Sequence, residues 1–262
     1  MIYYNVAQPL LLPSIKALPS PAHGPSFALR DAPAGDRLLL KHIPNALTLT
    51  RLILAPVIAW CFWFGTAATG YSQHGWSEAD QLQMKLFTTL AAILFVVAAL
   101  TDFFDGMAAR AFNAHSKFGR VIDPIEDKAL VGLPLIAIVL AEINGGSGRF
   151  LFIAPAVAVI VLRDVAMTAI RLAAPDGEGA RVSSLAKWKT ALELFAVGAY
   201  LIGVAIDFNF TTLTNESIDA LNVFMRVTEW TAWLWVLLIV ITAALSAYTA
   251  WQYLAPVKKP AS

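Results

Sequence analysis

The sequence predicts an all-α, polytopic membrane protein with six transmembrane helices. Hydrophobic residues make up 58% of the 262 residues, and charged residues make up only 14%. A soluble domain carries about 25% charged residues. Six apolar segments each approach the roughly 20 residues that a helix needs to cross a bilayer. Because lipid offers the backbone no hydrogen-bond partners, we expect each of these segments to be helical.

The chain divides into one membrane domain and two tails. Residues 1–40 are expected to form a flexible cytoplasmic N-terminal tail, because four prolines between residues 9 and 21 prevent a long helix. No basic region precedes an uninterrupted apolar run, so a cleaved signal peptide is not expected. Residues 41–256 are predicted to form the six-helix transmembrane domain, which residues 257–262 follow as a cytoplasmic C-terminal tail.

The six apolar segments follow one another with short polar connections. They cover about residues 46–67, 85–100, 122–141, 150–171, 187–206 and 228–254. The second segment continues into an acidic stretch, and the third begins within that stretch. The connection over residues 207–226 is polar and acidic, so we expect a solvated loop there.

The distribution of lysine and arginine predicts the orientation in the membrane. With the amino terminus in the cytoplasm, only Lys85, Arg149 and Arg226 of the 19 basic residues fall on the outer side. Such a bias is typical of cytoplasmic loops. Both termini and the acidic stretch are therefore expected on the cytoplasmic face of a bacterial-type inner membrane.

Tryptophans near the ends of the predicted spans support these boundaries. Indole rings favour the level of the lipid headgroups, where they form an aromatic belt. The tryptophans at such positions are Trp76, Trp188, Trp230 and Trp251.

Four aspartates mark the junction between the second and third segments. Asp102 and Asp105 are i,i+3 neighbours, and Asp123 and Asp127 are i,i+4 neighbours, so each pair shares one helix face. Two helices joined by a short turn would aim all four carboxylates at one point. Each aspartate at a helix centre costs about 2.5–3.5 kcal/mol in lipid. Bound divalent cations would offset that cost, and oxygen ligands favour Mg²⁺ or Mn²⁺.

The same stretch carries a family signature. Residues 102–127 match D-x-x-D-G-x-x-A-R-x8-G-x3-D-x3-D at every fixed position. This resembles the motif of the CDP-alcohol phosphatidyltransferases, membrane enzymes of phospholipid synthesis. The resemblance implies a CDP-activated lipid as donor and a catalytic domain that holds two Mg²⁺ or Mn²⁺ ions. Two ions can clamp the attacking and leaving groups of a phosphoryl transfer.

The resemblance also implies residue roles. Asp102, Asp105, Asp123 and Asp127 correspond to metal ligands. Asp123 and Asp127 are the expected catalytic residues, with Asp127 as the general base that takes the proton of the acceptor hydroxyl. We expect the metal ions to assist by favouring ionisation of that hydroxyl.

A further set of residues is expected to bind the CDP group. Gly106 leaves room for the nucleotide, and the guanidinium of Arg110 offers a planar fork to phosphate. Asn45 and Thr48 fall on one helix face with Arg51, where helix capping and membrane anchoring remain alternative roles. The expected CDP-binding residues are Gly106, Ala109, Arg110, Gly119, Asn45 and Thr48.

A basic cluster on the same side points to a phosphate-bearing acceptor. Arg163 lies inside an apolar run, where arginine is costly. Its neighbour Asp164 is not expected to face it, because consecutive helical residues point apart. The expected acceptor-phosphate residues are Arg163, Arg171, Lys187 and Lys189. Plain anchoring by positive charge remains the alternative.

These basic residues resemble the pattern R-[ED]…R…S-x-G-K-x-K-T in the branch of the family whose acceptor is glycerol 3-phosphate. Ala186 replaces the usual glycine, and Asp164 stands where glutamate is frequent. The resemblance implies transfer of a phosphatidyl group from CDP-diacylglycerol to sn-glycerol 3-phosphate, giving phosphatidylglycerophosphate and CMP. It also implies a homodimer among membrane lipids, and no nucleic-acid partner is expected.

Three alternatives remain at this point. A sister enzyme would use another acceptor, such as phosphatidylglycerol in a cardiolipin synthase, or an inositol phosphate. An intramembrane prenyltransferase would carry its acidic motifs on helix pairs far apart in sequence. A divalent-cation transporter would need polar groups along its membrane spans, whereas the apolar segments here are largely free of charge away from their inner ends.

Overall fold

The computed structural model describes residues 34–67, 76–112, 119–173, 184–211 and 218–254, and at some helix ends it describes the backbone path alone. The described residues contain six helices and no strand. The helices are α2 (Ala34–Ala67), α3 (Glu78–Phe112), α4 (Gly119–Asn144), α5 (Phe150–Ala173), α6 (Ser184–Thr211) and α7 (Ile218–Leu254). The predicted all-α fold class is confirmed.

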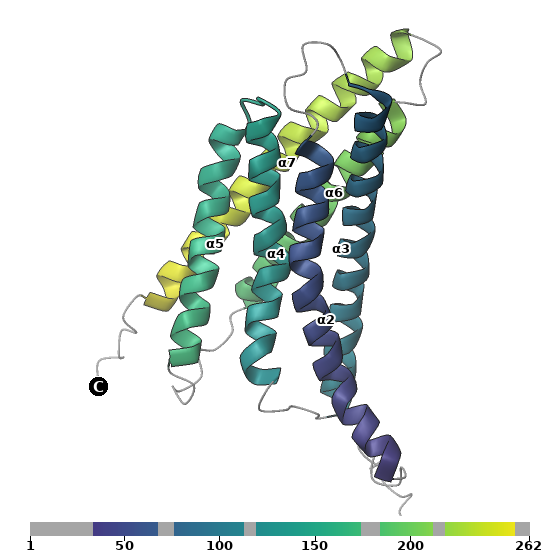
Figure 1. Ribbon diagram of the computed structural model, residues 1–262. Coiled ribbons are helices and arrows are strands. Elements are labelled where there is room, and N and C mark those ends of the chain that lie inside the picture. The colour runs from purple at the N-terminus through teal and green to yellow at the C-terminus, as the bar shows by residue number, and fades with distance from the viewer. Residues whose placement is uncertain (1–33, 68–75, 113–118, 174–183, 212–217, 255–262) are drawn as a thin grey trace, which may run out of the picture.

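Five of the six helices are long and apolar enough to cross a membrane. Their spans are Ala46–Ala67, Glu78–Asp102, Phe150–Ile170, Trp188–Phe210 and Asn222–Tyr253. The remaining helix, α4, carries Glu126, Asp127 and Lys128 near its start and Glu142 near its end, so its uncharged run, residues 129–141, is shorter than the roughly 20 residues of a full span. It nevertheless packs against α2 and α5, inside the bundle (Figure 1).

Several boundaries differ from the expected ones. α2 begins at Ala34, inside the stretch 1–40 expected to be a tail, while residues 1–33 lie outside the described part of the chain. The stretch 207–226 was expected to be a loop, but α6 continues to Thr211 and α7 begins at Ile218. No proline or glycine interrupts this stretch, so the polar residues extend both helices instead of ending them.

Two local sequences explain where helices begin and turn. Ser77 and Asp80 form a capping box at the start of α3, in which the Asp80 carboxylate accepts from Ser77 N at 3.0 Å and Asp80 N donates to Ser77 Oγ at 3.2 Å. At the end of α4, Gly146 adopts a φ of 64°, and Gly145 N donates to Ala141 O at 2.8 Å. A left-handed glycine ends a helix readily, so the chain reverses here into α5.

The first described helix makes most of its contacts with two other helices. α2 packs most extensively against α4 and α3 and lies between them in Figure 1. α6 packs against α3 and α7, and α7 packs in turn against α5. α2 therefore sets the position of α3 relative to α4, the two helices that carry the four aspartates.

Small residues bring the helices close together. Ala55, Ala91, Ala98 and Ala196 are fully buried at helix contacts. A side chain at Gly65 of α2 would place its Cβ 3.0 Å from the backbone nitrogen of Thr88 in α3. In lipid, helix association depends on such close packing. Lipid tails are as apolar as the helix surfaces, so the hydrophobic effect does not drive the helices together.

The tryptophans expected at span ends lie on the surface. Trp76, Trp188, Trp230 and Trp251 expose between 48% and 73% of their surface. Rings that project outward in this way are available to the headgroup region, as the aromatic-belt interpretation requires.

Candidate active site

A buried arginine joins the two acidic helix ends. Arg51 on α2 donates from Nη1 to the Oδ1 atom of Asp102 on α3. The same Nη1 lies 3.4 Å from Oε1 of Glu126 on α4. Arg51 and Glu126 are each only 3% exposed. A buried charge needs its partner, so this triad holds the acidic ends of α3 and α4 on either side of α2.

Asp127 connects this triad to a second charged group. It is partly buried and lies within electrostatic range of Asp102 and Arg51 on one side and of Lys128 and Asp164 on the other. Asp102 and Asp127 therefore interact electrostatically, although they lie on separate helices. Glu126, one residue earlier, pairs with Arg51 instead.

The other two aspartates can be placed only by their backbone. Asp105 follows Asp102 by one turn on α3, and Asp123 precedes Asp127 by one turn on α4. Their side chains lie outside the described part of the structure. The same holds for the side chains of the predicted CDP-binding residues Gly106, Ala109, Arg110, Gly119 and Asn45.

The described donor set is compatible with a hard divalent cation. Asp102 and Asp127 offer carboxylate oxygens, the ligands that Mg²⁺ and Mn²⁺ favour. Among the side chains that the structure describes, no three acidic, histidine or cysteine groups gather around one point. A complete metal site would need the carboxylates of Asp105 and Asp123, whose positions on α3 and α4 share a face with Asp102 and Asp127.

Thr48 lies one turn before Arg51 on α2. It is 6% exposed and therefore belongs to the buried side of the helix. Its position on the face shared with Arg51 follows from the i,i+3 spacing seen in the sequence.

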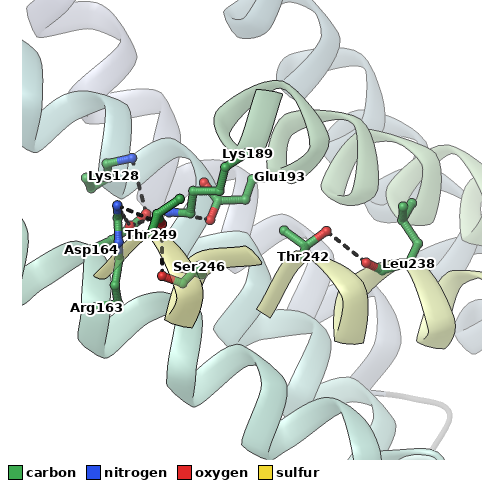
Figure 2. A network of polar contacts seen from close by, with 9 residues as sticks. All are labelled: Lys128, Arg163, Asp164, Lys189, Glu193, Leu238, Thr242, Ser246 and Thr249. Carbon is green, nitrogen blue, oxygen red and sulfur yellow. Dashed lines mark hydrogen bonds and ion pairs between the residues drawn. The ribbon is translucent and has the colours of Figure 1, made fainter. Parts of the chain in front are cut away.

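A second network is centred on Asp164 of α5 (Figure 2). Its Oδ1 atom accepts from Arg163 Nη1 at 2.8 Å and from Lys189 Nζ at 2.5 Å. Its Oδ2 atom lies 3.2 Å from Lys128 Nζ on α4. Asp164 is 4% exposed, and three cations compensate its buried charge. One carboxylate therefore links α4, α5 and α6.

Further contacts extend the network to α7 and along α6. Lys189 Nζ also lies 2.7 Å from Oε1 of Glu193, one turn later on α6. Arg163 Nη2 donates to Thr249 Oγ1 at 3.1 Å, and that hydroxyl donates to Ser246 O at 2.9 Å. Lys189 is 1% exposed and Glu193 is 0% exposed. Three cations thus meet two carboxylates, which leaves the network positive.

The pairing of Arg163 with Asp164 corrects an expectation. Consecutive Cβ atoms on a helix do point apart, but the long arginine side chain brings its guanidinium back to the neighbouring carboxylate. Lys128 and Glu193 were not among the predicted site residues. The i,i+4 spacing of Lys189 and Glu193 could have revealed that pair, whereas nothing local singles out Lys128.

Arg171 and Lys187 are the remaining predicted acceptor residues. They lie on the last turn of α5 and the first turn of α6, near the helix ends that flank the Asp164 network. Their side chains are outside the described part of the structure.

Two cavities that described residues line lie away from both charged groups. One of about 800 Å³ is lined by Glu142, Arg149 and Tyr200 among others. Tyr200 Oη donates to Glu142 at 2.5 Å, and Arg149 Nε donates to it at 3.3 Å. Glu142 follows Asp127 by about four turns on α4, which is roughly 22 Å. This cluster neutralises a buried carboxylate at the opposite end of the bundle.

Comparison with known proteins assigns the chain to a family. Residues 41–241 match the CDP-alcohol phosphatidyltransferase family, a range that includes both charged groups except Ser246 and Thr249. Three relatives are each called CDP-diacylglycerol–glycerol-3-phosphate 3-phosphatidyltransferase.

The relative from Cereibacter sphaeroides is 31% identical over 227 residues, which cover 80% of this chain and 93% of the relative. The relative from Rickettsia typhi is 33% identical over 164 residues, covering 63% of this chain and 78% of the relative. The relative from Bacillus subtilis is 34% identical over 164 residues, covering 62% and 77%. With the acidic motif, the six helices and the matched range taken together, this chain belongs to the CDP-alcohol phosphatidyltransferase family.

Proposed function

We propose that this protein transfers the phosphatidyl group of CDP-diacylglycerol to sn-glycerol 3-phosphate in phospholipid biosynthesis. The products are phosphatidylglycerophosphate and CMP. One observation carries the proposal: Asp127 lies within electrostatic range both of Asp102 in the Arg51 triad and of Asp164 in the second network. This reaction needs a base between the site for the donor's diphosphate, at the acidic helix ends, and the site for the acceptor's phosphate, at the Asp164 network. The relatives named for the same transfer support the choice of substrates.

The acidic residues would hold two Mg²⁺ or Mn²⁺ ions. Asp102 and Asp105 would act from α3, and Asp123 and Asp127 from α4. When bound, the ions would neutralise the diphosphate oxygens of the donor and assist ionisation of the acceptor hydroxyl. Arg51 keeps Asp102 in position for this role through their partly buried ion pair.

The CDP group would lie along the inner ends of α2, α3 and α4. Gly106, Ala109 and Gly119 would leave room for the nucleotide, and Arg110 would contact its phosphates. Asn45 and Thr48 would complete this surface from α2, where Thr48 faces the bundle.

The reaction itself is one displacement. The acceptor oxygen forms a bond to the phosphorus of the phosphatidyl group, while the bond from that phosphorus to the CMP oxygen breaks. Asp127 takes the proton of the acceptor hydroxyl, and CMP leaves with the bonding electrons. The partial burial of the Asp127 side chain limits competition from water for that proton.

The acceptor would bind where positive charge is in excess. Arg163 and Lys189 supply part of that charge, and Arg171 and Lys187 would add to it from the adjacent helix ends. A phosphate beside these groups would place the acceptor hydroxyl on the side of Asp127.

The arrangement in the cell follows from the distribution of basic residues. Residues 41–256 would form the catalytic membrane domain, with residues 1–40 and 257–262 as cytoplasmic tails. The active site would face the cytoplasm from a bacterial-type inner membrane. A homodimer is proposed from membership of the family, and no nucleic-acid partner is proposed.

Release of CMP from CDP-diacylglycerol tests the proposal directly. The purified protein should release CMP with glycerol 3-phosphate and far less with phosphatidylglycerol or an inositol phosphate. Asp127→Asn should reduce turnover by roughly a hundredfold or more, because loss of a general base typically costs 10²–10⁴-fold. Asp80→Asn, at the opposite end of α3, is the matched control and should retain turnover.

Two results would contradict this. Strong turnover with another acceptor and none with glycerol 3-phosphate would assign the protein to a sister activity. Near-normal turnover of Asp127→Asn would remove the base assignment while leaving the substrates unaffected.

A further inference from the structure

The three cations on Asp164 are held unequally. Lys189 is 1% exposed and contacts two carboxylates, those of Asp164 and Glu193. Arg163 contacts Asp164 and also donates to Thr249. Lys128 has one ion pair among the described residues, at 3.2 Å, and its side chain is the most exposed of the three, at 21%. Among the three cations, Lys128 therefore has the fewest contacts with the described residues of the network (Figure 2).

The consequences of releasing each cation differ as well. If Lys189 left the network, Glu193 would remain buried at 0% exposure without its ion pair. If Lys128 left, Asp164 would still accept from Arg163 and Lys189. An uncompensated buried charge is strongly destabilising, whereas a carboxylate that keeps two cations is not uncompensated. Asp164 can therefore release Lys128 and still keep two cations.

Lys128 is also placed next to the proposed base. It directly follows Asp127 on α4, and both side chains lie within range of Asp164. A long lysine side chain can turn from Asp164 toward a ligand whose hydroxyl approaches Asp127. A phosphate offers more negative charge and more acceptor oxygens than the single carboxylate oxygen that Lys128 now contacts.

We propose that Lys128 makes the direct ionic contact to the acceptor's phosphate, by exchanging its ion pair with Asp164 for one with that phosphate. Arg163 and Lys189 stay on Asp164 and keep the surrounding helices in place. This inference rests on the proposed function, and it adds a specificity-determining residue that the motifs do not mark. An acceptor without a phosphate would leave Lys128 on Asp164 and bind weakly.

Steady-state kinetics of the full chain test this assignment. CMP release is measured with glycerol 3-phosphate varied at saturating CDP-diacylglycerol, and then with the two roles exchanged. Lys128→Met should raise KM for glycerol 3-phosphate by roughly ten- to a hundredfold, the effect of losing one charge-assisted hydrogen bond. KM for CDP-diacylglycerol should stay within about twofold of the wild-type value.

Inorganic phosphate provides a second measurement. As a competitor of glycerol 3-phosphate, it should show an inhibition constant that rises in Lys128→Met in parallel with KM. Lys128→Arg keeps the charge and should recover most of the affinity. Lys85→Met, a lysine near the opposite end of the bundle on α3, should change neither constant.

The outcomes separate the two proposals. A wild-type protein that releases no CMP with glycerol 3-phosphate overturns the proposed function, and this inference with it. An active wild type with an unchanged KM in Lys128→Met overturns the inference alone. So does a variant in which both KM values and the unfolding temperature shift together, since that is the signature of a structural lysine. Lys128→Gln is measured in parallel, so that the result does not depend on one folded variant.

Discussion

At the scale of single residues, Arg51 is the side chain on which the acidic site depends most. It is buried in the bundle and faces a carboxylate from α3 and another from α4. Its position in the sequence suggested a helix cap or an anchor as readily as a contact with the site. In the structure, Arg51 both compensates the buried charge of Glu126 and orients Asp102.

Removing this arginine should therefore cost stability. Arg51→Met leaves Glu126 buried without its cation, and breaking a buried pair costs about 3–5 kcal/mol. We expect a clearly lower unfolding temperature in detergent, with Arg51→Lys intermediate between this variant and the wild type. Arg226→Met, an exposed arginine on α7, is the control and should unfold with the wild type. Equal unfolding temperatures for both methionine variants would show that the triad contributes nothing to stability.

At the scale of helices, the close contact between α2 and α3 sets the geometry of the site. Gly65 lies where α2 touches the backbone of α3, and the nearest atom to an added Cβ is a backbone nitrogen that cannot rotate away. A displacement of α3 at this point would also move the helix that carries Asp102. Gly203 on α6, by contrast, has no atom within 4 Å of an added Cβ.

These two glycines make a matched pair of variants. Gly65→Ala should destabilise the protein by about 1–3 kcal/mol, because overpacking a tight contact forces helices apart. Gly203→Ala should be neutral or stabilise by up to about 1 kcal/mol, because alanine favours helix and meets open space. Thermal unfolding of the two variants checks this. Unfolding of Gly65→Ala at or above the wild-type temperature would mean that α2 and α3 adjust freely.

At the scale of the whole molecule, both charged groups of the proposed site gather at one end of the bundle, while Glu142, Arg149 and Tyr200 form a separate cluster toward the other end. The bias in basic residues predicts that the first end faces the cytoplasm. The termini are predicted to lie on that same side of the membrane.

Thiol labelling in intact cells tests this orientation. The chain has one cysteine, Cys61, which is 2% exposed and gives little background. A membrane-impermeant maleimide should label Gly148→Cys, in the exposed connection between α4 and α5, from outside and should label Ser262→Cys only after the cells are opened. The reverse pattern would place the acidic site on the outer face and would contradict the proposed access to cytoplasmic substrates.

Much of the architecture could be predicted from the sequence because membrane helices are specified locally. A run of about 20 apolar residues forms a helix in lipid whatever its neighbours do, since only a helix satisfies the backbone hydrogen bonds within a single segment. The spacing of Asp102, Asp105, Asp123 and Asp127 likewise indicated which residues share a face. Helix ends were predicted less well, because capping at Ser77 and the polar turns of α6 and α7 depend on single contacts.

The sequence by itself thus determined the class of fold, the acidic motif and the resemblance to a family. The tertiary structure alone decided the charge pairings: Arg51 with Asp102, 51 residues apart, Lys189 with Asp164, 25 apart, and Tyr200 with Glu142, 58 apart. Periodicity places a residue on a face of its own helix, but it carries no information on which helix that face meets. Partner choice follows from how α2 to α7 pack, and packing is a property of the folded bundle.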